Sequence, residues 1–303
     1  MVAVVTGAAG FIGTVLVEKL TRRGPVLAID RLPMTRRPGV TALTADLLGQ
    51  DPGVAAALSQ ASAVYHLAGC PDVRDPRPDA EQRRYRDNVL ATAAVLTWVP
   101  PDVPLVVTSS SSVYGGTRDG RPSAETDRLN PRGGYARSKL LVERLCDARL
   151  QSGGAVAIVR PFTVAGEGQR PGMALAQWIS AVRSGRPLRL LGDPERTRDI
   201  TDVRHVADAL IDLADRGAHG TVNVGTGVGH PLRELAAAVC ASLGVELCTV
   251  LDRPHPAEVT HTLADTRKLR ELIGWVPHTD LAALIARQVA ATEAVAATRP
   301  CVA

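Results

Sequence analysis

The sequence is poor in aromatic side chains, which make up 3% of its 303 residues. So few rings cannot form the stacking platforms on which single-stranded nucleic acids are bound. No charge of one sign dominates either, because 35 basic residues face 31 acidic ones and the net charge is only +4. The arginines are scattered along the chain, so we expect no nucleic-acid partner.

Cysteine is also sparse. The chain has five cysteines, which are Cys70, Cys146, Cys240, Cys248 and Cys301. Their number is odd, they lie far apart, and none belongs to a CxxC or Cys/His spacing typical of a metal site. We therefore expect free thiols in a reducing compartment and no bound metal ion.

Long apolar runs are absent as well, since none approaches the ~20 residues needed to cross a bilayer. Strand-like residues begin at Val2, which leaves no room for a signal peptide. The sequence therefore predicts a cytoplasmic protein with no membrane partner.

The chain does contain 45% hydrophobic residues, enough for one large α/β domain or a domain with a smaller companion. A short apolar run from Val2 to Thr6 leads directly into GAAGFIG at 7–13, and a helical pattern follows. Glycines in such a turn let the backbone approach a pyrophosphate, and the helix N-terminus supplies N–H groups to it. The stretch therefore predicts a dinucleotide site, although its spacing is GxxGxxG rather than GxGxxG.

Asp30 ends the second apolar run, at about the separation from the glycines that is expected for an acidic residue on the adenosine ribose. A carboxylate there accepts hydrogen bonds from a 2′-hydroxyl and repels a 2′-phosphate, which favours NAD over NADP. Arg31, Arg36 and Arg37 follow it and offer an alternative, because arginines bind phosphate.

Strands and helices alternate along the rest of the chain. Short apolar runs predict strands at 26–29, 40–45, 64–67, 105–108, 155–159, 188–191 and 221–224. Periodic apolar positions predict helices at 79–98, 134–151, 174–184, 203–216, 231–243, 265–272 and 279–297. This alternation predicts an α/β fold with a Rossmann-type doubly wound parallel sheet. We expect residues 1–160 to bind the cofactor, 197–226 to return to that domain, and 161–303 to form mainly a smaller substrate-binding region.

Two stretches in the middle of the chain carry reactive side chains. Tyr135 precedes Lys139 by four residues, so the two lie on one face of a helix, and a nearby ammonium favours a phenolate able to act as a general base. Four consecutive serines, 109–112, follow the expected strand 105–108, at the edge of the sheet where doubly wound folds bind ligands. Alone, either pattern also occurs in a solvated helix or a flexible loop.

In this order, the motifs resemble the extended short-chain dehydrogenase/reductase family, in its NAD-dependent epimerase/dehydratase branch, over almost the whole chain. The matching pieces are GAAGFIG at 7–13, Asp30, Asp46-Leu47, HLAG at 66–69, Asn88, SSSSVYG at 109–115, YARSK at 135–139, RPFTVAGEGQRPGMA at 160–174, RDITDV at 198–203, NVGTG at 223–227 and ADTRKLRELIGWVP at 264–277.

The resemblance implies a role for each matching position. Tyr135 would be the catalytic base, Lys139 would hold the nicotinamide ribose and lower the tyrosine pKa, and Ser110 and Ser112 would lie at the reacting sugar. The implied NAD site comprises Gly7, Gly10, Phe11, Ile12, Gly13, Asp30, Arg31, Asp46, Leu47, Leu67, Ala68, Gly69, Asn88, Thr108, Tyr135, Lys139 and Pro161. The implied nucleotide-sugar site comprises Arg74, Ser111, Thr163, Arg170, Arg198 and Arg253, with the last two on the diphosphate.

The serine run bears on which reaction follows. Dehydratases similar to this chain carry an Asp-Glu pair at the positions of Ser111 and Ser112, and decarboxylases carry a Glu at Ser112. Without those acids, a 4-epimerase that returns the hydride to the other face of the sugar is the interpretation that remains. The alternatives are a dehydratase, a decarboxylase, an NADP-dependent 4-ketoreductase and a non-enzymatic NAD-sensing protein.

Thr163 and Arg170 stand where similar UDP-glucuronate 4-epimerases bind the sugar carboxylate, so UDP-glucuronate is the predicted substrate, with a neutral UDP-sugar as the alternative. The chain departs from the family where VYGP reads Val164-Ala165-Gly166-Glu167 and where YGxSK reads YARSK. The family also implies a homodimer through the helices near Asn88 and Tyr135.

Overall fold

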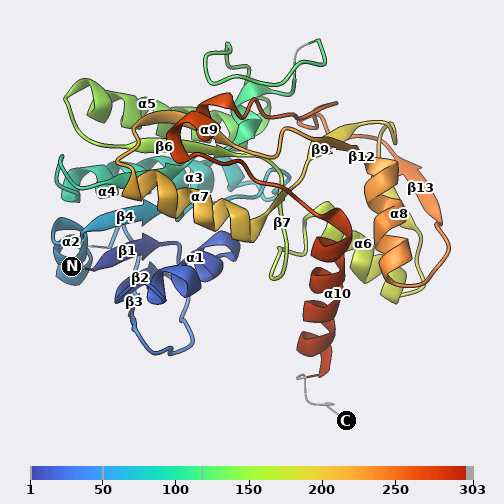
Figure 1. Cartoon of the computed structure of the whole chain (residues 1–303), viewed down its shortest axis with the longest axis horizontal. Helices are drawn as coiled ribbons and strands as arrows, with labels where there is room; N and C mark the ends of the chain where they lie inside the picture. Colours follow the sequence, from blue (N-terminus) through green and yellow to red (C-terminus); the bar gives the residue numbers. More distant parts are fainter. Residues whose placement is uncertain (1, 50, 118, 298–303) are drawn as a thin grey trace.

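The computed structural model of the chain describes residues 2–49, 51–117 and 119–297. Over these residues one parallel sheet of seven strands has the order β11-β6-β5-β4-β1-β2-β3 (Figure 1). Its strands are β1 (Ala3–Thr6), β2 (Val26–Asp30), β3 (Val40–Thr44), β4 (Ala63–His66), β5 (Leu105–Thr108), β6 (Ala157–Pro161) and β11 (Gly220–Val224). The predicted Rossmann-type doubly wound sheet is confirmed, with its switch point between β1 and β4.

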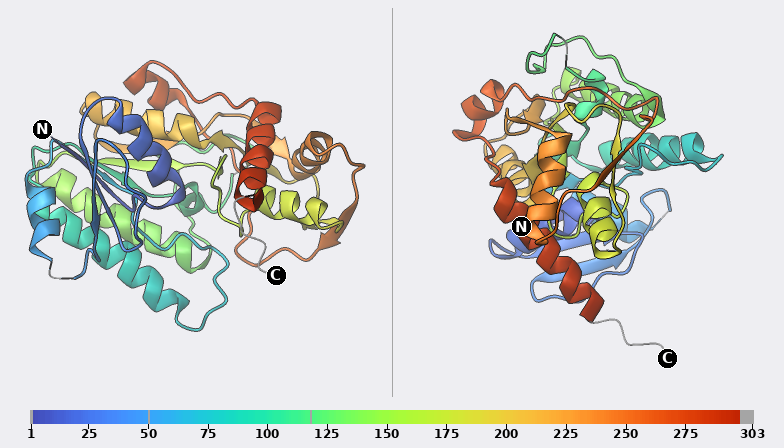
Figure 2. Two further views of the ribbon diagram at one scale, coloured as in Figure 1. Left: turned by 90° about the horizontal axis from the view of Figure 1, so that it is seen from below. Right: turned by 90° about the vertical axis from the view of Figure 1, so that its right-hand side faces the viewer.

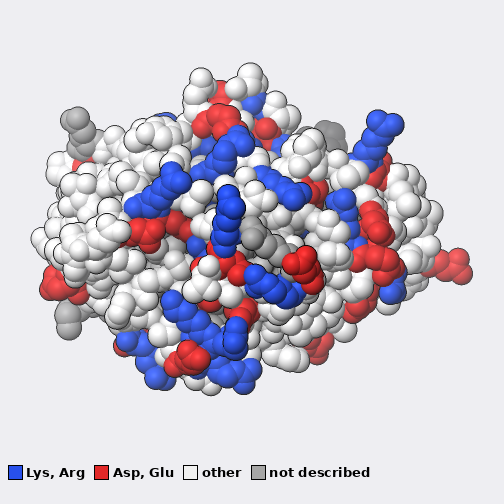
Figure 3. Space-filling view, turned by 90° about the horizontal axis from the view of Figure 1, so that it is seen from above, with Lys and Arg blue, Asp and Glu red and all other residues white. Residues whose placement is uncertain are grey.

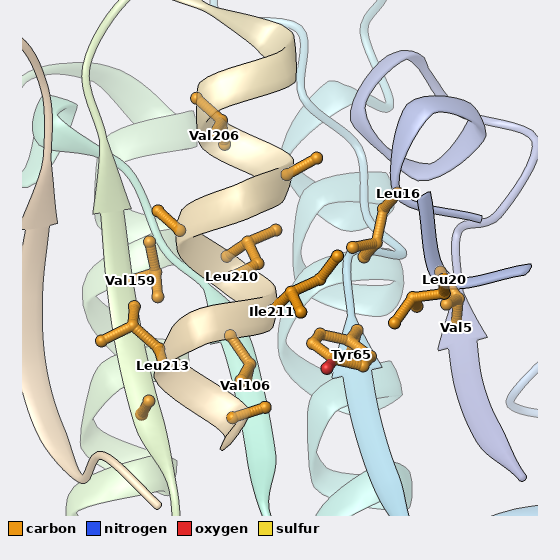
Figure 4. Packing of buried hydrophobic residues seen from close by; sticks show 14 of the residues in the cluster. Val5, Leu16, Leu20, Tyr65, Val106, Val159, Val206, Leu210, Ile211 and Leu213 are labelled. Atoms are coloured by element: carbon orange, nitrogen blue, oxygen red, sulfur yellow. The ribbon is translucent and has the colours of Figure 1, made fainter. Parts of the chain in front are cut away.

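Helices cover both faces of this sheet. On one face lie α1 (Phe11–Thr21), α7 (Val203–Asp215) and α9 (Arg267–Ile273), and on the other lie α2 (Pro52–Ser59), α4 (Ala91–Trp98) and α5 (Gly133–Gln151). Neighbouring strand residues point to opposite faces, so Val106 packs under α7 while Val107 packs in the opposite layer. Figure 4 shows Leu210 and Leu213 of α7 in the first of these layers. Burial on both faces explains why the inner strands, such as β5, are continuous apolar runs, whereas the edge strand β3 is partly exposed and contains two threonines.

The single helix predicted at 79–98 contains a change of geometry. It consists of α3 (Ala80–Arg84), a π-helical segment (Tyr85–Leu90) and α4, without a break in the chain. π-helical turns inside α-helices occur often at functional sites. Here the π segment carries Asp87 and Asn88, two side chains whose contacts are described below.

A smaller lobe follows the sixth strand. Its core is formed by α6 (Ala174–Arg183), β8 (Leu188–Leu191), α8 (Leu232–Ser242) and α10 (Leu281–Ala297), at the far end of the molecule from β2 and β3 (Figure 2). Three two-stranded sheets join the lobe to the cleft. They pair β7 (Val164–Ala165) with β10 (Thr201–Asp202), β9 (Thr197–Asp199) with β12 (Gly229–Pro231), and β8 with β13 (Thr249–Asp252).

The cysteines of the described ranges are free thiols, with Cys70, Cys146 and Cys240 buried and Cys248 exposed. Cys301 lies outside the described residues. Within the part of the chain that the structure covers, no helix combines the length and apolar character that a bilayer crossing requires.

Candidate active site

A cleft of about 960 Å³ opens at the carboxyl ends of the sheet strands, between the sheet and the smaller lobe. It brings together nearly all of the predicted site residues, namely Gly7, Gly10, Phe11, Ile12, Gly13, Asp30, Arg31, Asp46, Leu47, Leu67, Ala68, Gly69, Arg74, Thr108, Ser110, Ser111, Ser112, Tyr135, Lys139, Pro161, Thr163, Arg170 and Arg198. Asn88 and Arg253 are the two predicted residues that do not line it.

The glycine turn after β1 fits closely against its surroundings. A Cβ on Gly7, whose φ is +71°, would lie 2.5 Å from the backbone nitrogen of Ala68, and a Cβ on Gly13 would lie 2.2 Å from the Gly7 oxygen. No side chain caps the N-terminus of α1, so its first N–H groups and its positive dipole end are available to an anion. The turn therefore suits the pyrophosphate of a dinucleotide.

Asp30 lies at the end of β2, where its carboxylate fixes this turn. One oxygen accepts a hydrogen bond from the Ala9 N–H and the other accepts one from the Leu32 N–H, both at 2.9 Å. Because Asp30 also lines the cleft, it has the position of an acceptor for the ribose hydroxyls of NAD.

Beside Asp30, a chain of ion pairs crosses the rim of the cleft. Arg31 donates two hydrogen bonds to Asp87, at 3.0 and 2.9 Å. Arg86 joins Asp87 to Asp46, at 2.7 and 2.5 Å. Both arginines are thus matched by carboxylates, which weighs against a site for a 2′-phosphate. Arg86 and Asp87 also line the cleft, and no local sequence signal marks them because they reach it through the π-helical segment.

Asn88, on the same segment, points inward and is 1% exposed. Its side chain accepts from the Cys70 N–H at 2.7 Å and donates to the Ser138 hydroxyl at 2.8 Å. A Cβ on Gly69 would lie 2.6 Å from its oxygen, so the loop after β4 packs directly on it. Asn88 therefore ties that loop to α5 instead of lining the cleft.

The serine run and α5 meet at the centre of the cleft. Ser110 and Tyr135 both line the cleft at this point. Burial raises the pKa of Tyr135, and the Ser110 hydroxyl and the Arg170 guanidinium oppose that rise. Arg170 lines the same cleft, whereas the Lys139 ammonium bonds to the Thr108 carbonyl. The buried Ser112 hydroxyl has no hydrogen-bond partner within the described parts of the chain, and Ser112 lines the same cleft.

Lys139 is buried one helical turn after Tyr135. Its ammonium donates to the Thr108 carbonyl at 2.8 Å, and burial lowers its pKa to about 8. The contact fixes α5 to the end of β5, where the serine run begins.

A buried polar network supports the serine run from behind. Glu143 pairs with Arg160 at 2.7 and 2.9 Å and accepts the Ser109 hydroxyl at 2.5 Å. Arg160 also donates to the Tyr114 hydroxyl at 2.8 Å, and Tyr114 donates to Asn223 at 2.7 Å. Burial alone would lower the pKa of Arg160, but Glu143 raises it above its usual range. Sequence reasoning did not single out Glu143, whose position one turn after Lys139 is its only local signal.

On the other side of the cleft, Glu258 forms ion pairs with two of the arginines that are predicted to bind the substrate. Arg198 donates to Glu258 at 3.0 Å and to the carbonyls of Val259 and Thr260 at 2.9 and 3.1 Å. Arg74 approaches the other Glu258 oxygen at 3.4 Å. Glu258, which the sequence analysis missed, therefore links the long loop after β4 to the smaller lobe.

Arg253 lies directly after β13 and away from the cleft, so the structure does not bring it to Arg198. Thr163 and Arg170 do line the cleft, and Arg170 donates to the Pro71 carbonyl at 3.3 Å. Over the described residues the cleft has more basic than acidic side chains, although the outer face in Figure 3 mixes both signs. This local surplus suits ligands that carry phosphates.

Comparisons with known proteins agree with this geometry. A model of the NAD dependent epimerase/dehydratase family matches residues 3–225. The chain is 31% identical, over 95% of its length and 97% of the relative's, to a UDP-glucose 4-epimerase of Mycolicibacterium smegmatis. Among solved structures it is similar to MoeE5 in complex with UDP-glucuronic acid and NAD, with a TM-score of 0.87, 34% identity and coverage of 97% of this chain and 100% of that one. It is also similar to the UDP-glucuronic acid 4-epimerase of Bacillus cereus in complex with UDP-glucuronic acid and NAD, with a TM-score of 0.90, 25% identity and the same coverages.

The match to the family model over residues 3–225 and the 31% identity to a relative over 95% of the chain show the same family. The chain belongs to the NAD-dependent epimerase/dehydratase family.

Proposed function

We propose that this protein is a nucleotide-sugar 4-epimerase whose preferred substrate is UDP-glucuronate. The observation that carries the proposal is that Tyr135 and Ser110 line one cleft, in which Ser111 and Ser112 stand instead of the acids of dehydratases and decarboxylases. A serine hydroxyl is a poor proton carrier at neutral pH, so Tyr135 is the proton-transferring group that this proposal assigns at the sugar. A 4-epimerase needs no more than that.

The residues present fit NAD, which when bound supplies a reversible hydride acceptor for C4 of the sugar. The glycine turn and the N-terminus of α1 would hold its pyrophosphate, Asp30 its adenosine ribose and Lys139 its nicotinamide ribose. The Thr108 carbonyl already holds the buried ammonium of Lys139 in place, so little conformational entropy is lost when the ammonium binds a ribose hydroxyl.

Tyr135 would move the proton. Its phenol oxygen takes the proton from O4 of the sugar when C4 is oxidised, and gives it back when C4 is reduced. Ser110 holds O4 beside the phenol. The positive charge of Arg170 favours the phenolate, which helps a phenol whose pKa burial raises.

The choice of a uronate rests on Thr163 and Arg170. The Arg170 guanidinium is close enough to Tyr135 to lower its pKa, which supports a position beside the reacting sugar. A planar guanidinium and a hydroxyl are a chemically suitable pair for a C6 carboxylate. Two similar solved proteins are complexes with UDP-glucuronic acid, which agrees with this choice.

The second candidate is a 4-epimerase of a neutral UDP-sugar, which the similarity to UDP-glucose 4-epimerase favours. A ketoreductase using NADP is disfavoured by Asp30 and by the pairing of Arg31 with Asp87. A non-enzymatic sensor of NAD has no need of a tyrosine base and a serine in the same cleft.

We also propose that the protein forms a homodimer through the π-helical segment and α5. Tyr85 and Leu90 are apolar side chains of this segment that are 52% and 40% exposed. Light scattering coupled to size-exclusion chromatography tests this: Tyr85→Arg should give monomers, and an unchanged mass would contradict the proposal.

One incubation tests the reaction. The purified protein receives UDP-glucuronate without added cofactor, and the sugar is followed by NMR and mass spectrometry. We expect an isomer of unchanged mass with an inverted C4 proton. Loss of carbon dioxide would identify a decarboxylase, loss of water a dehydratase, and turnover of UDP-glucose alone would select the neutral sugar.

A further inference from the structure

The loop that carries Arg170 has little internal structure to hold it. It runs over residues 166–173 between β7 and α6, and both Gly166 and Gly168 have positive φ, at +142° and +81°. Within it, two turn hydrogen bonds join Gln169 to Gly166 and Met173 to Arg170. Among the residues that the structure describes, the Arg170 guanidinium has only a long bond of 3.3 Å to the Pro71 carbonyl and a 3.8 Å contact with the Met173 sulfur.

The C-terminal helix α10 lies beside this loop in Figure 1 and contacts it through two consecutive residues of the helix, Arg287 and Gln288. The Gln288 side-chain amide donates to the Gln169 side-chain oxygen at 2.7 Å, and the Gln169 amide donates to the Val164 carbonyl at 2.9 Å. Gln288 is 2% exposed, and Gln169 lines the cleft. A relay of two amides, buried at Gln288 and half-buried at Gln169, thus runs from α10 to the residue directly before Arg170.

The second contact between α10 and the loop is an ion pair. Arg287 donates to Glu167 at 2.9 Å and to Asp202 at 2.5 Å, and Asp202 caps the N-terminus of α7 by accepting from the Arg204 N–H at 2.9 Å. Glu167 stands where the family motif usually has proline. Proline would fix the backbone of the loop by its own ring, whereas here a tertiary contact with α10 does so.

From this arrangement we propose that Gln288 is a positioning residue for Arg170, and that α10 thereby determines selectivity for uronates. The inference rests on the proposed function, because it takes Arg170 as the receptor of the substrate carboxylate. Gln288 acts through Gln169, because the backbone of Gln169 determines the position of the neighbouring Arg170 Cα atom. Without the amide relay, the loop samples positions in which the guanidinium no longer meets the carboxylate.

The test uses Gln288→Met, which keeps the length of the side chain and removes the amide. It also removes the Gln288 side-chain oxygen, which is buried and has no partner among the residues that the structure describes, so the variant is expected to fold. The matched control is Thr292→Ala on the same helix, because Thr292 accepts from Arg183 of α6 at 2.7 Å and is four residues further from the loop contact.

Two measurements are made on the wild-type protein, both variants and Arg170→Ala. The first is kcat and KM for UDP-glucuronate and UDP-glucose. We expect Gln288→Met to raise KM for the uronate about tenfold and for the neutral sugar less than about twofold. Any fall in kcat should be equal for both sugars, because Arg170 also favours the Tyr135 phenolate and this effect does not depend on the sugar. Adding it to Arg170→Ala should change nothing further, because both changes remove one interaction.

The second measurement is hydrogen–deuterium exchange of residues 166–173 in the protein without substrate. Gln288→Met should speed exchange in this loop, and Thr292→Ala should not. Unchanged exchange, equal KM changes for both sugars, or an additive effect with Arg170→Ala would each overturn the inference. If Arg170→Ala itself affects both sugars equally, the carboxylate assignment fails and the selectivity claim fails with it, while the exchange data still decide whether α10 positions the loop.

Discussion

The Lys139 ammonium nitrogen lies 2.8 Å from the Thr108 carbonyl oxygen, so this lysine of α5 bonds to the last residue of β5. Lys139 is 7% exposed and its pKa is lowered to about 8 by burial. An ammonium in this environment stays poised for a ligand hydroxyl, but its burial costs stability whenever it is charged.

This cost predicts a pH dependence. The folded-state pKa of about 8 lies below the unfolded value of about 10.4, so between these two pH values the unfolded chain binds more protons. Stability contributed by this group therefore rises with pH across that window, and below it the full cost is present. We expect the wild-type protein to gain stability relative to Lys139→Met between about pH 8 and pH 10.

Urea unfolding of both proteins, stripped of cofactor, measures the difference at each pH. Comparing the two proteins cancels the titration of tyrosines and cysteines that they share. A difference that does not change with pH would mean that Lys139 titrates alike in both states.

The Glu143–Arg160 pair gives a second prediction. Their side chains are 3% and 4% exposed, so removing one partner leaves a buried charge unpaired. We expect Arg160→Met to cost about 3–5 kcal/mol of unfolding free energy. Adding Glu143→Leu should recover part of this loss, because the unpaired carboxylate disappears.

Chemical denaturation of the two single variants and the double variant gives the coupling. The control is Arg22→Ala, which breaks the exposed i,i+4 pair with Glu18, where the two side chains are 70% and 55% exposed. That change should cost no more than about 0.5 kcal/mol. Equal losses for the buried and the exposed pair would contradict the structural role assigned to Arg160.

The sequence predicts those elements of the fold whose pattern lies within a few consecutive residues, and it does not predict those that depend on distant partners. The strands of the large sheet are visible because burial on both faces makes them continuous apolar runs, as at β5 and β6. Strands of two or three residues, such as β7 and β10, have no periodicity to detect, and they form only because the chain brings them together.

The same reasoning applies to the site. Gly7 and Asp30 carry their signals in a short motif. Glu258 and Gln288 do not, since each acquires its role from a partner about 60 or more residues away in the sequence. Asn88 is the opposite case. Its motif position predicts a contact with the cofactor, but its side chain lies in the π-helical segment and bonds to Ser138 in the interior.

Asp30 supplies a third prediction. Its two oxygens hold the Ala9 and Leu32 N–H groups, and Asp30→Ala would leave both without a partner and remove the acceptor for the ribose. We expect NAD affinity to fall by about 10- to 100-fold and NADP affinity to fall less, because the carboxylate no longer repels a 2′-phosphate.

Calorimetric titration of the stripped protein with both dinucleotides measures this change. Asp51→Ala serves as the control, because Asp51 caps α2 by accepting from the Gly53 N–H at 2.8 Å and does not line the cleft. It should lower stability by about 1 kcal/mol and leave NAD binding unchanged. Equal loss of both dinucleotides in Asp30→Ala would show that the carboxylate only supports the turn.

The last prediction concerns the base itself. Tyr135→Phe removes the hydroxyl and leaves the ring in place. We expect kcat to fall by about 10²- to 10⁴-fold, the usual contribution of a positioned general base, while NAD affinity changes less than about twofold. Tyr65→Phe is the control, because Tyr65 is 2% exposed in the core under α7 and away from the cleft (Figure 4). Residual activity above about a tenth of wild type would remove Tyr135 from the role of base, whereas a parallel loss of NAD binding would assign its hydroxyl to the cofactor.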